Sequence, residues 1–185
     1  MKKIIITIIS ILIVGLGGFV AWRYYAGKSS VPQAPISPST LANNDPQAAQ
    51  DNSAAYTDPD RRFSFTKPAG FIARSISDND GETILIQKAD NAGSSFQIFI
   101  SSFDEPGPIT PARIHKDVPD MIINNAQQAV VGKNKLTALI FKSIEPSIGE
   151  TREMWLISDR YLYQITAPIA LDSVAAEMMK TWESK

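Results

Sequence analysis

The sequence predicts a mixed α/β domain that follows an apolar N-terminal segment, in a chain of 185 residues. Strand-like runs, separated by turn residues, fill much of residues 56–185. Several of these runs are apolar on both faces, which predicts a sheet covered on both sides. Two segments with helix signals can provide that cover. The predicted fold class is therefore α/β (α+β), preceded by one transmembrane helix.

Residues 1–26 are expected to form an N-terminal transmembrane signal-anchor. Two lysines precede residues 4–22, which contain nineteen residues and no charge. As a helix this segment is about 28 Å long, close to the roughly 30 Å thickness of the hydrocarbon core. The aromatic residues between Trp22 and Tyr25 suit the membrane interface. Their bulk favours an uncleaved anchor over a cleaved signal peptide, which remains the alternative.

The charges that flank residues 4–22 predict the topology of the chain. The amino terminus and two lysines lie before the segment, whereas Arg23 and Lys28 lie after it. The positive-inside rule then places the short start in the cytoplasm. We expect a single-pass protein of the cell membrane, bound through residues 4–22, with an extracytoplasmic C-terminal domain.

Residues 27–55 are expected to be a disordered linker. They are rich in Pro, Ser and Ala and contain almost no large apolar side chain. Such a segment cannot bury enough surface to offset the entropy cost of ordering. A flexible linker of this length spans roughly 30 Å on average, so it would keep the domain near the membrane.

The domain is expected to occupy residues 56–185, beginning with the alternating strand 62–66. Residues 83–89 and 94–103 suggest two strands joined by a hairpin connection at 90–93. Further strands are expected at 129–132, 136–144, 152–158 and 161–167, the last two joined at Asp159-Arg160.

Two helices are predicted in the same domain. Thr110 followed by Pro111 is a strong helix start, and Pro119 should end that helix after about two turns. In the C-terminal segment, apolar residues recur at helical spacing and predict an amphipathic helix that packs on the sheet. These residues are Leu171, Val174, Ala175, Met178, Met179 and Trp182.

Two stretches resemble PsbP-like domains. Residues 56–71 contain Phe63-Ser64-Phe65 followed by Pro68 and Phe71, similar to the opening strand of that family. Residues 154–166, with the segment up to Trp182, look like its closing hairpin and helix. The resemblance implies a central antiparallel sheet flanked by helices, an α/β/α sandwich. In photosynthetic members the family supports photosystem II on the lumenal side, and related domains serve as assembly or binding modules. For this chain the resemblance implies a membrane-tethered bacterial copy of the fold.

The composition excludes several kinds of chemistry. The chain has no Cys and one His, which removes thiol nucleophiles and Cys-ligated metals and leaves little room for a His-based site. A net charge of −1 argues against nucleic-acid binding. The sequence contains no G-x-S-x-G, P-loop or G-x-G-x-x-G motif. We therefore assign no catalytic, cofactor-binding or metal residue, and expect no enzyme activity and no cofactor.

Two features come nearest to a site. Residues 78–82 are acidic, but their Gly81 falls at the fourth position rather than the sixth position of a calcium loop, which favours a turn. His115 is expected to be a solvated surface residue. Ser94, Ser95, Ser101 and Ser102 have no identifiable base partner.

The predicted function is that of a membrane-tethered, extracytoplasmic, non-enzymatic binding or assembly module with a protein partner at the membrane surface. Two alternatives remain open. One is a metal- or ligand-binding module, and the other is a hydrolase whose site is assembled from scattered residues.

Overall fold

The computed structural model describes residues 54–77 and 81–185. The predicted anchor and nearly all of the predicted linker therefore lie outside the described residues. Within the described part, no helix is both long and apolar enough to cross a bilayer.

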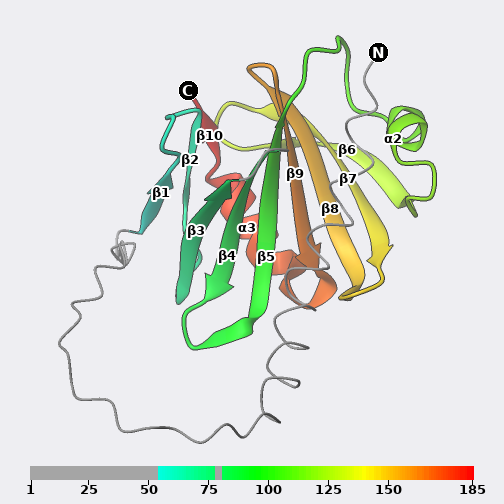
Figure 1. Ribbon diagram of the computed structural model, residues 1–185. Helices are drawn as coiled ribbons and strands as arrows, with labels where there is room; N and C mark the ends of the chain where they lie inside the picture. Colours follow the sequence, from blue (N-terminus) through cyan, green and yellow to red (C-terminus); the bar gives the residue numbers. More distant parts are fainter. Residues whose placement is uncertain (1–53, 78–80) are drawn as a thin grey trace, which may run out of the picture. The chain divides into compact units, whose positions relative to one another are not determined.

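A seven-stranded antiparallel sheet forms the centre of the domain (Figure 1). Its spatial order is β3-β4-β5-β9-β8-β7-β6. The strands are β3 (Phe71–Ser77), β4 (Glu82–Lys88), β5 (Asn91–Ser102), β6 (Asn124–Val131), β7 (Leu136–Glu145), β8 (Gly149–Ser158) and β9 (Tyr161–Pro168). This confirms the predicted central sheet.

A second, three-stranded sheet joins the two ends of the folded part. It consists of β1 (Ala55–Thr57), β2 (Phe63–Thr66) and β10 (Glu183–Ser184), in the order β1-β2-β10. The sequence patterns indicated β2 but neither of its partners, because three-residue and two-residue strands are too short to show periodicity.

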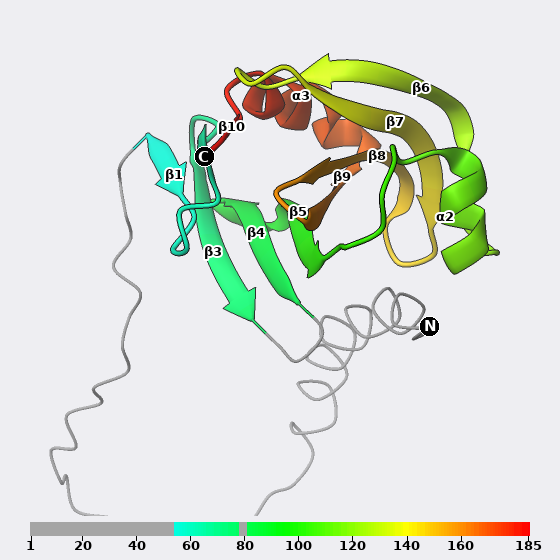
Figure 2. The ribbon, with the colours of Figure 1, turned by 90° about the horizontal axis from the view of Figure 1, so that it is seen from above.

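One helix packs on each face of the large sheet. Helix α3 (Asp172–Lys180) follows the short 3₁₀ helix η1 (Ile169–Leu171), and the large sheet curves around it (Figure 2). Its buried residues share one core with β2 and the sheet: Ala175, Met178 and Met179. Helix α2 (Pro111–Asp117) places Ile114 in a separate core on the other face, with Phe141 and Trp155. The predicted cover on both faces is thus confirmed.

The predicted start of α2 and the predicted β8–β9 turn are confirmed. Thr110 accepts a hydrogen bond from the Arg113 amide and caps α2, which ends before Pro119. The β8–β9 turn places Asp159 and Arg160 at φ 48° and 68°, as a tight hairpin turn requires.

Several element boundaries differ from the expected ones. Strand β6 begins at Asn124 rather than at residue 129, and β3 was not predicted. Helix α3 ends at Lys180, so Trp182 lies beyond the helix rather than on its last turn. Its indole stacks on Phe63 with ring centroids 4.3 Å apart and is fully buried. Trp182 therefore anchors the C-terminal strand and the helix together.

Candidate functional site

A small pocket opens on the face of the sheet that carries α2. The loop before α2 forms its wall, and strands β7 and β8 form its floor. Its volume is about 270 Å³. The lining residues are Gly107, Pro108, Ile109, Thr137, Leu139 and Ile157. The pocket is somewhat smaller than a typical small-molecule site, so it suits one bulky side chain or a small apolar fragment.

Arg113 holds the loop that forms one wall of this pocket. From the first turn of α2, its Nη1 donates to the carbonyl oxygens of Pro106, Gly107 and Pro108 at 3.2, 3.0 and 3.4 Å. Its Nη2 forms an ion pair with Glu105 at 3.0 Å. The guanidinium also lies 4.6 Å from the centroid of the Phe103 ring. The loop is thus tied to α2 before any ligand arrives.

The pocket lining limits what the pocket can do. Its side chains are aliphatic apart from the Thr137 hydroxyl, and no lining residue carries an ionisable group. The surface of the pocket presents polar backbone atoms as well as aliphatic side chains, and these side chains supply neither a general acid nor a general base.

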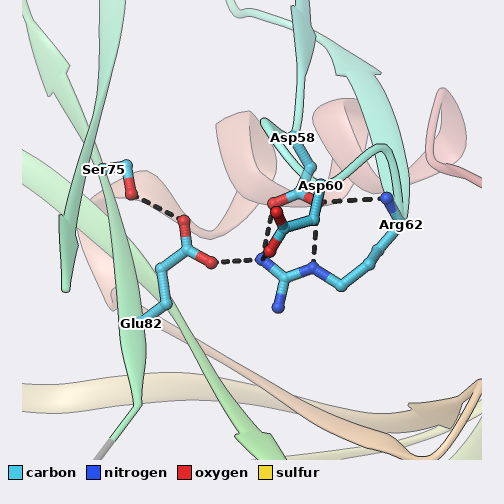
Figure 3. Close-up of polar contacts among 5 residues, drawn as sticks. All are labelled: Asp58, Asp60, Arg62, Ser75 and Glu82. Carbon is cyan, nitrogen blue, oxygen red and sulfur yellow. Dashed lines mark hydrogen bonds and ion pairs between the residues drawn. The ribbon is translucent and has the colours of Figure 1, made fainter. Parts of the chain in front are cut away.

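A second polar feature is the Arg62 cluster, formed by Arg62, Asp58, Asp60, Glu82 and Ser75 (Figure 3). The Arg62 guanidinium donates to both carboxylate oxygens of Asp58, at 2.9 and 2.7 Å. It also forms an ion pair with Glu82, whose other oxygen accepts from Ser75 Oγ at 2.6 Å. Because Arg62 precedes β2 whereas Glu82 begins β4, the cluster joins the small sheet to the large one.

Apart from Asp60, whose side chain is 78% exposed, the cluster is closed rather than open to a ligand. The Asp58 side chain is fully buried, and those of Arg62 and Glu82 are only 13% and 15% exposed. Hydrogen bonding to Asp58 is the main cause that raises the pKa of Arg62. The guanidinium lies 5.0 Å from the centroid of the Tyr161 ring. These contacts satisfy the groups from within, which is typical of a structural ion cluster.

Two tyrosines lie beside this cluster, the buried Tyr163 and the half-buried Tyr56. Burial is the main cause that raises the pKa of Tyr163 to about 12. Burial also raises the pKa of Tyr56, with the Glu82 charge adding to the effect. The Tyr56 hydroxyl is buried without a hydrogen-bond partner among the described residues. Both phenols are therefore neutral at ordinary pH and act as packing groups.

Glu153, on β8, is a buried carboxyl group with a perturbed pKa. It accepts hydrogen bonds from Thr151 Oγ1 at 2.7 Å, Thr166 Oγ1 at 2.8 Å and Trp155 Nε1 at 3.4 Å. Burial raises its pKa, and these hydrogen bonds partly oppose that rise. All three donors are neutral, so the charged form lacks a cation to compensate for the lost hydration.

The residues considered from the sequence do not come together. His115 lies on α2, and its Nε2 donates to the Met121 carbonyl at 3.0 Å, which supports the chain after the helix. The four serines lie on β5, a central strand. The acidic run 78–82 lies partly outside the described residues, and its Glu82 belongs to the Arg62 cluster. Within residues 54–77 and 81–185, no group of three or more His, Asp or Glu could hold a metal ion.

Sequence reasoning missed Arg62 and Arg113. Asp58 and Arg62 are four residues apart, so their ion pair had a local signal in the spacing of opposite charges. Glu82 is twenty residues from Arg62, and no pattern indicates that contact. Arg113 had a weaker signal, since it lies in the first turn after the helix start at Thr110-Pro111.

Comparison with known proteins shows the fold. No protein-family model and no curated protein matches the sequence. The solution structure of cyanobacterial PsbP (CyanoP) from Synechocystis sp. PCC 6803 matches with a TM-score of 0.51 at 11% identity, covering 71% of this chain and 91% of that one. A 1.50 Å crystal structure from Bacteroides thetaiotaomicron VPI-5482 gives a TM-score of 0.43 at 12% identity, covering 71% and 48%. The folded part of this chain therefore has a PsbP-like fold.

Proposed function

We propose that this chain is a membrane-tethered, extracytoplasmic module that binds a protein partner and catalyses no reaction. The observation that carries the proposal is the pocket beneath the 105–109 loop, whose lining side chains are aliphatic apart from Thr137 and carry no ionisable group, and whose loop wall is tied to α2 by Arg113. The PsbP-like fold supports the proposal, because the matched structure is a cyanobacterial PsbP and domains of this kind act as assembly or binding modules. The uncharged segment 4–22 supports the tether.

The pocket fits an apolar side chain of the partner. Leu139 and Ile109 are 4% and 6% exposed and form its floor and wall, while Thr137 lies at its exposed rim. A buried apolar anchor surrounded by a polar rim is the usual arrangement of an interaction hot spot. Glu153 does not compete with this reading, because its carboxylate is fully engaged by neighbouring donors.

Site-specific photo-crosslinking of the full chain in its native membrane tests the binding surface. A photoreactive phenylalanine at Thr137 should form a discrete protein adduct, whereas the same group at Glu177, on α3 at the other face, should not. Ile157→Lys should reduce the Thr137 adduct, because it places a charge in the pocket. Equal adducts from both positions, or none from Thr137, would refute the proposed surface.

Protease accessibility tests the topology separately. Protease added after permeabilisation of any outer envelope should digest residues 56–185 while the inner membrane is intact. Complete protection under those conditions would place the domain in the cytoplasm and contradict the proposed location.

A small apolar ligand is the second candidate occupant, favoured by the modest volume of the pocket. In that case the Thr137 probe yields no protein adduct, and an added apolar fluorophore is displaced by membrane extracts but not by purified protein fractions. The two candidates thus give opposite results in the same pair of assays.

A further inference from the structure

Three exposed isoleucines lie at one end of the large sheet. Ile144 and Ile148, at the β7–β8 turn, are 54% and 49% exposed, and Ile169, in η1, is 37% exposed. Ile144 pairs with Glu150 of β8, and β9 ends opposite the next residue of β8, directly before Ile169. The three side chains therefore belong to the same end of the domain, and we call them the isoleucine tip.

The chain enters the folded domain near the isoleucine tip. Ala55 pairs with Thr66, and four residues later the Gly70 carbonyl oxygen accepts a hydrogen bond from the Ala89 amide at 2.8 Å. Ala89 belongs to the β4–β5 turn, which lies at the same end of the sheet as the β7–β8 turn and η1 (Figure 1). Four extended residues cover at most about 14 Å, so the proposed tether would be attached close to this end.

The charges next to the isoleucine tip are largely paired. Lys142 forms an ion pair with Glu150 at 3.0 Å, and Arg152 forms one with Asp172 at 3.0 Å. Glu145, at the start of the turn, adds one further carboxyl group. These groups do not make the basic surface with which proteins bind anionic headgroups. The contact that this end of the domain favours is therefore apolar.

We propose that the isoleucine tip inserts into the headgroup region of the membrane that carries the tether. The inference rests on the proposed function, because the choice of a lipid surface follows from where the tethered chain enters the domain. A flexible linker over residues 27–55 spans roughly 30 Å on average, which is enough for the tip to reach the lipid. Three isoleucines bury little apolar surface on their own. The tether compensates for this by keeping the tip at a high local concentration beside the membrane.

Contact through the isoleucine tip would also orient the pocket. Thr137 and Ile157 line the pocket near the β8–β9 turn, at the other end of β7 and β8 from the β7–β8 turn. Figure 1 shows the loop before α2 at that far end as well. A domain that rests on its isoleucine tip would thus hold the pocket away from the lipid, where a protein partner can reach it.

Single-cysteine labelling of the full chain in phosphatidylcholine vesicles tests the contact. The chain has no native cysteine, so each introduced thiol is unique. An environment-sensitive fluorophore on Ile148→Cys should shift its emission to shorter wavelength, and should lose emission when the lipids carry nitroxide quenchers near the headgroup. The same fluorophore on Ile76→Cys, at a position 55% exposed on β3, should show neither change. Equal quenching at both positions, or none at residue 148, would overturn the proposal.

A fluorophore on Leu12→Cys separates failure of the tip from failure of the tether. Nitroxides deep in the acyl chains should quench it if residues 4–22 span the bilayer. Quenching at residue 12 without quenching at residue 148 would refute the tip contact and leave the tether intact, whereas no quenching at residue 12 would refute both. A shift at residue 148 that requires added membrane proteins would assign the tip to a protein and overturn the lipid contact.

Two further measurements test whether the contact is apolar. Ile144→Asp with Ile169→Asp should abolish the quenching at residue 148, because both positions are exposed in the fold but would carry charges into the lipid. Raising the salt concentration should leave that quenching unchanged, because salt screens charges and not apolar contacts. Quenching that survives both aspartates, or that salt removes, would contradict insertion of the isoleucine tip.

Discussion

Removing the Arg62 side chain should reveal how strongly the two sheets are held together. Arg62→Met keeps most of the aliphatic stem but removes the cation that neutralises Asp58 and Glu82. The Asp58 side chain is fully buried, and its carboxylate would lose two charge-assisted hydrogen bonds. Breaking one partner of a buried pair costs about 3–5 kcal/mol. Because Arg62 retains 13% exposure, we expect a loss near the lower limit, about 3 kcal/mol.

Urea unfolding, followed by the fluorescence of the buried Trp155 and Trp182, measures this loss. With a slope of about 2 kcal/mol per molar urea, the midpoint should fall by roughly 1.5 M. Lys142→Met is the matched control, since it breaks an ion pair with Glu150 whose side chains are 33% and 49% exposed. Exposed pairs contribute about 0–1 kcal/mol, so that midpoint should hardly move.

A compensated variant separates lost charge balance from lost packing. Arg62→Met combined with Asp58→Asn and Glu82→Gln removes the two carboxylates that the single variant leaves without a cation. It should recover at least half of the lost stability, because most of the cost comes from uncompensated buried charge. If Arg62→Met costs no more than Lys142→Met, or if the triple variant is as unstable as the single one, the cluster does not hold the sheets as argued.

Three further changes test the packing and the buried acid. Gly132→Ala should destabilise more than Gly149→Ala. Both glycines have positive φ, 69° and 83°, so the backbone strain is similar. A Cβ at Gly132 would lie 2.6 Å from the Trp182 carbonyl oxygen, whereas a Cβ at Gly149 would meet none of the described atoms within 4 Å. Equal losses of stability in thermal unfolding would contradict this prediction. Trp182→Ala should cost about 3–5 kcal/mol in urea unfolding, because its indole is fully buried against Phe63; a loss below 1 kcal/mol would show that the site collapses without cost. Burial raises the pKa of Glu153 above the ordinary 4.5, so the folded state holds this proton more tightly than the unfolded chain. The stability that this group contributes is therefore full below pH 4.5 and is lost as the pH rises through the folded-state pKa. Glu153→Gln should remove that part of the pH dependence in unfolding measured from pH 4 to 9, and parallel curves for the two proteins would contradict the assignment.

The sequence was most informative where a local rule and the tertiary structure agree. Strand β9 pairs with both β5 and β8, and its apolar run was recognisable without knowing those partners. The Asp159-Arg160 turn requires two residues with positive φ, which limits the places where a tight hairpin can form. In α3, three residues at helical spacing are buried as predicted: Ala175, Met178 and Met179.

The missed features depend on contacts between distant parts of the chain. Strand β10 contains two residues, and it exists because Glu183 pairs with Ser64 across more than half the chain. Strand β3 has an exposed second half and no alternating apolar pattern there, so its pairing with β4 defines it. The wall of the pocket depends on Arg113 reaching back six residues to the Gly107 carbonyl. The hydrophobic periodicity of a short segment does not predict contacts between residues far apart in the sequence.

In the proposed tethered protein, the Arg62 cluster would help to hold the small sheet, which lies next to the linker, on the body of the domain. Any pull from the membrane would enter the domain at Ala55, through a strand that pairs with β2 at three positions. Strand β2 would transmit it to the body of the domain through two kinds of contact. Phe63 and Phe65 pack against Trp182, and Arg62, just before the strand, is bonded to Glu82 of β4. Since β1 holds few hydrogen bonds of its own, resistance to that pull should depend on the anchoring of β2. Arg62→Met should therefore weaken the attachment of the N-terminal strand more than it weakens the pairing of β7 with β8.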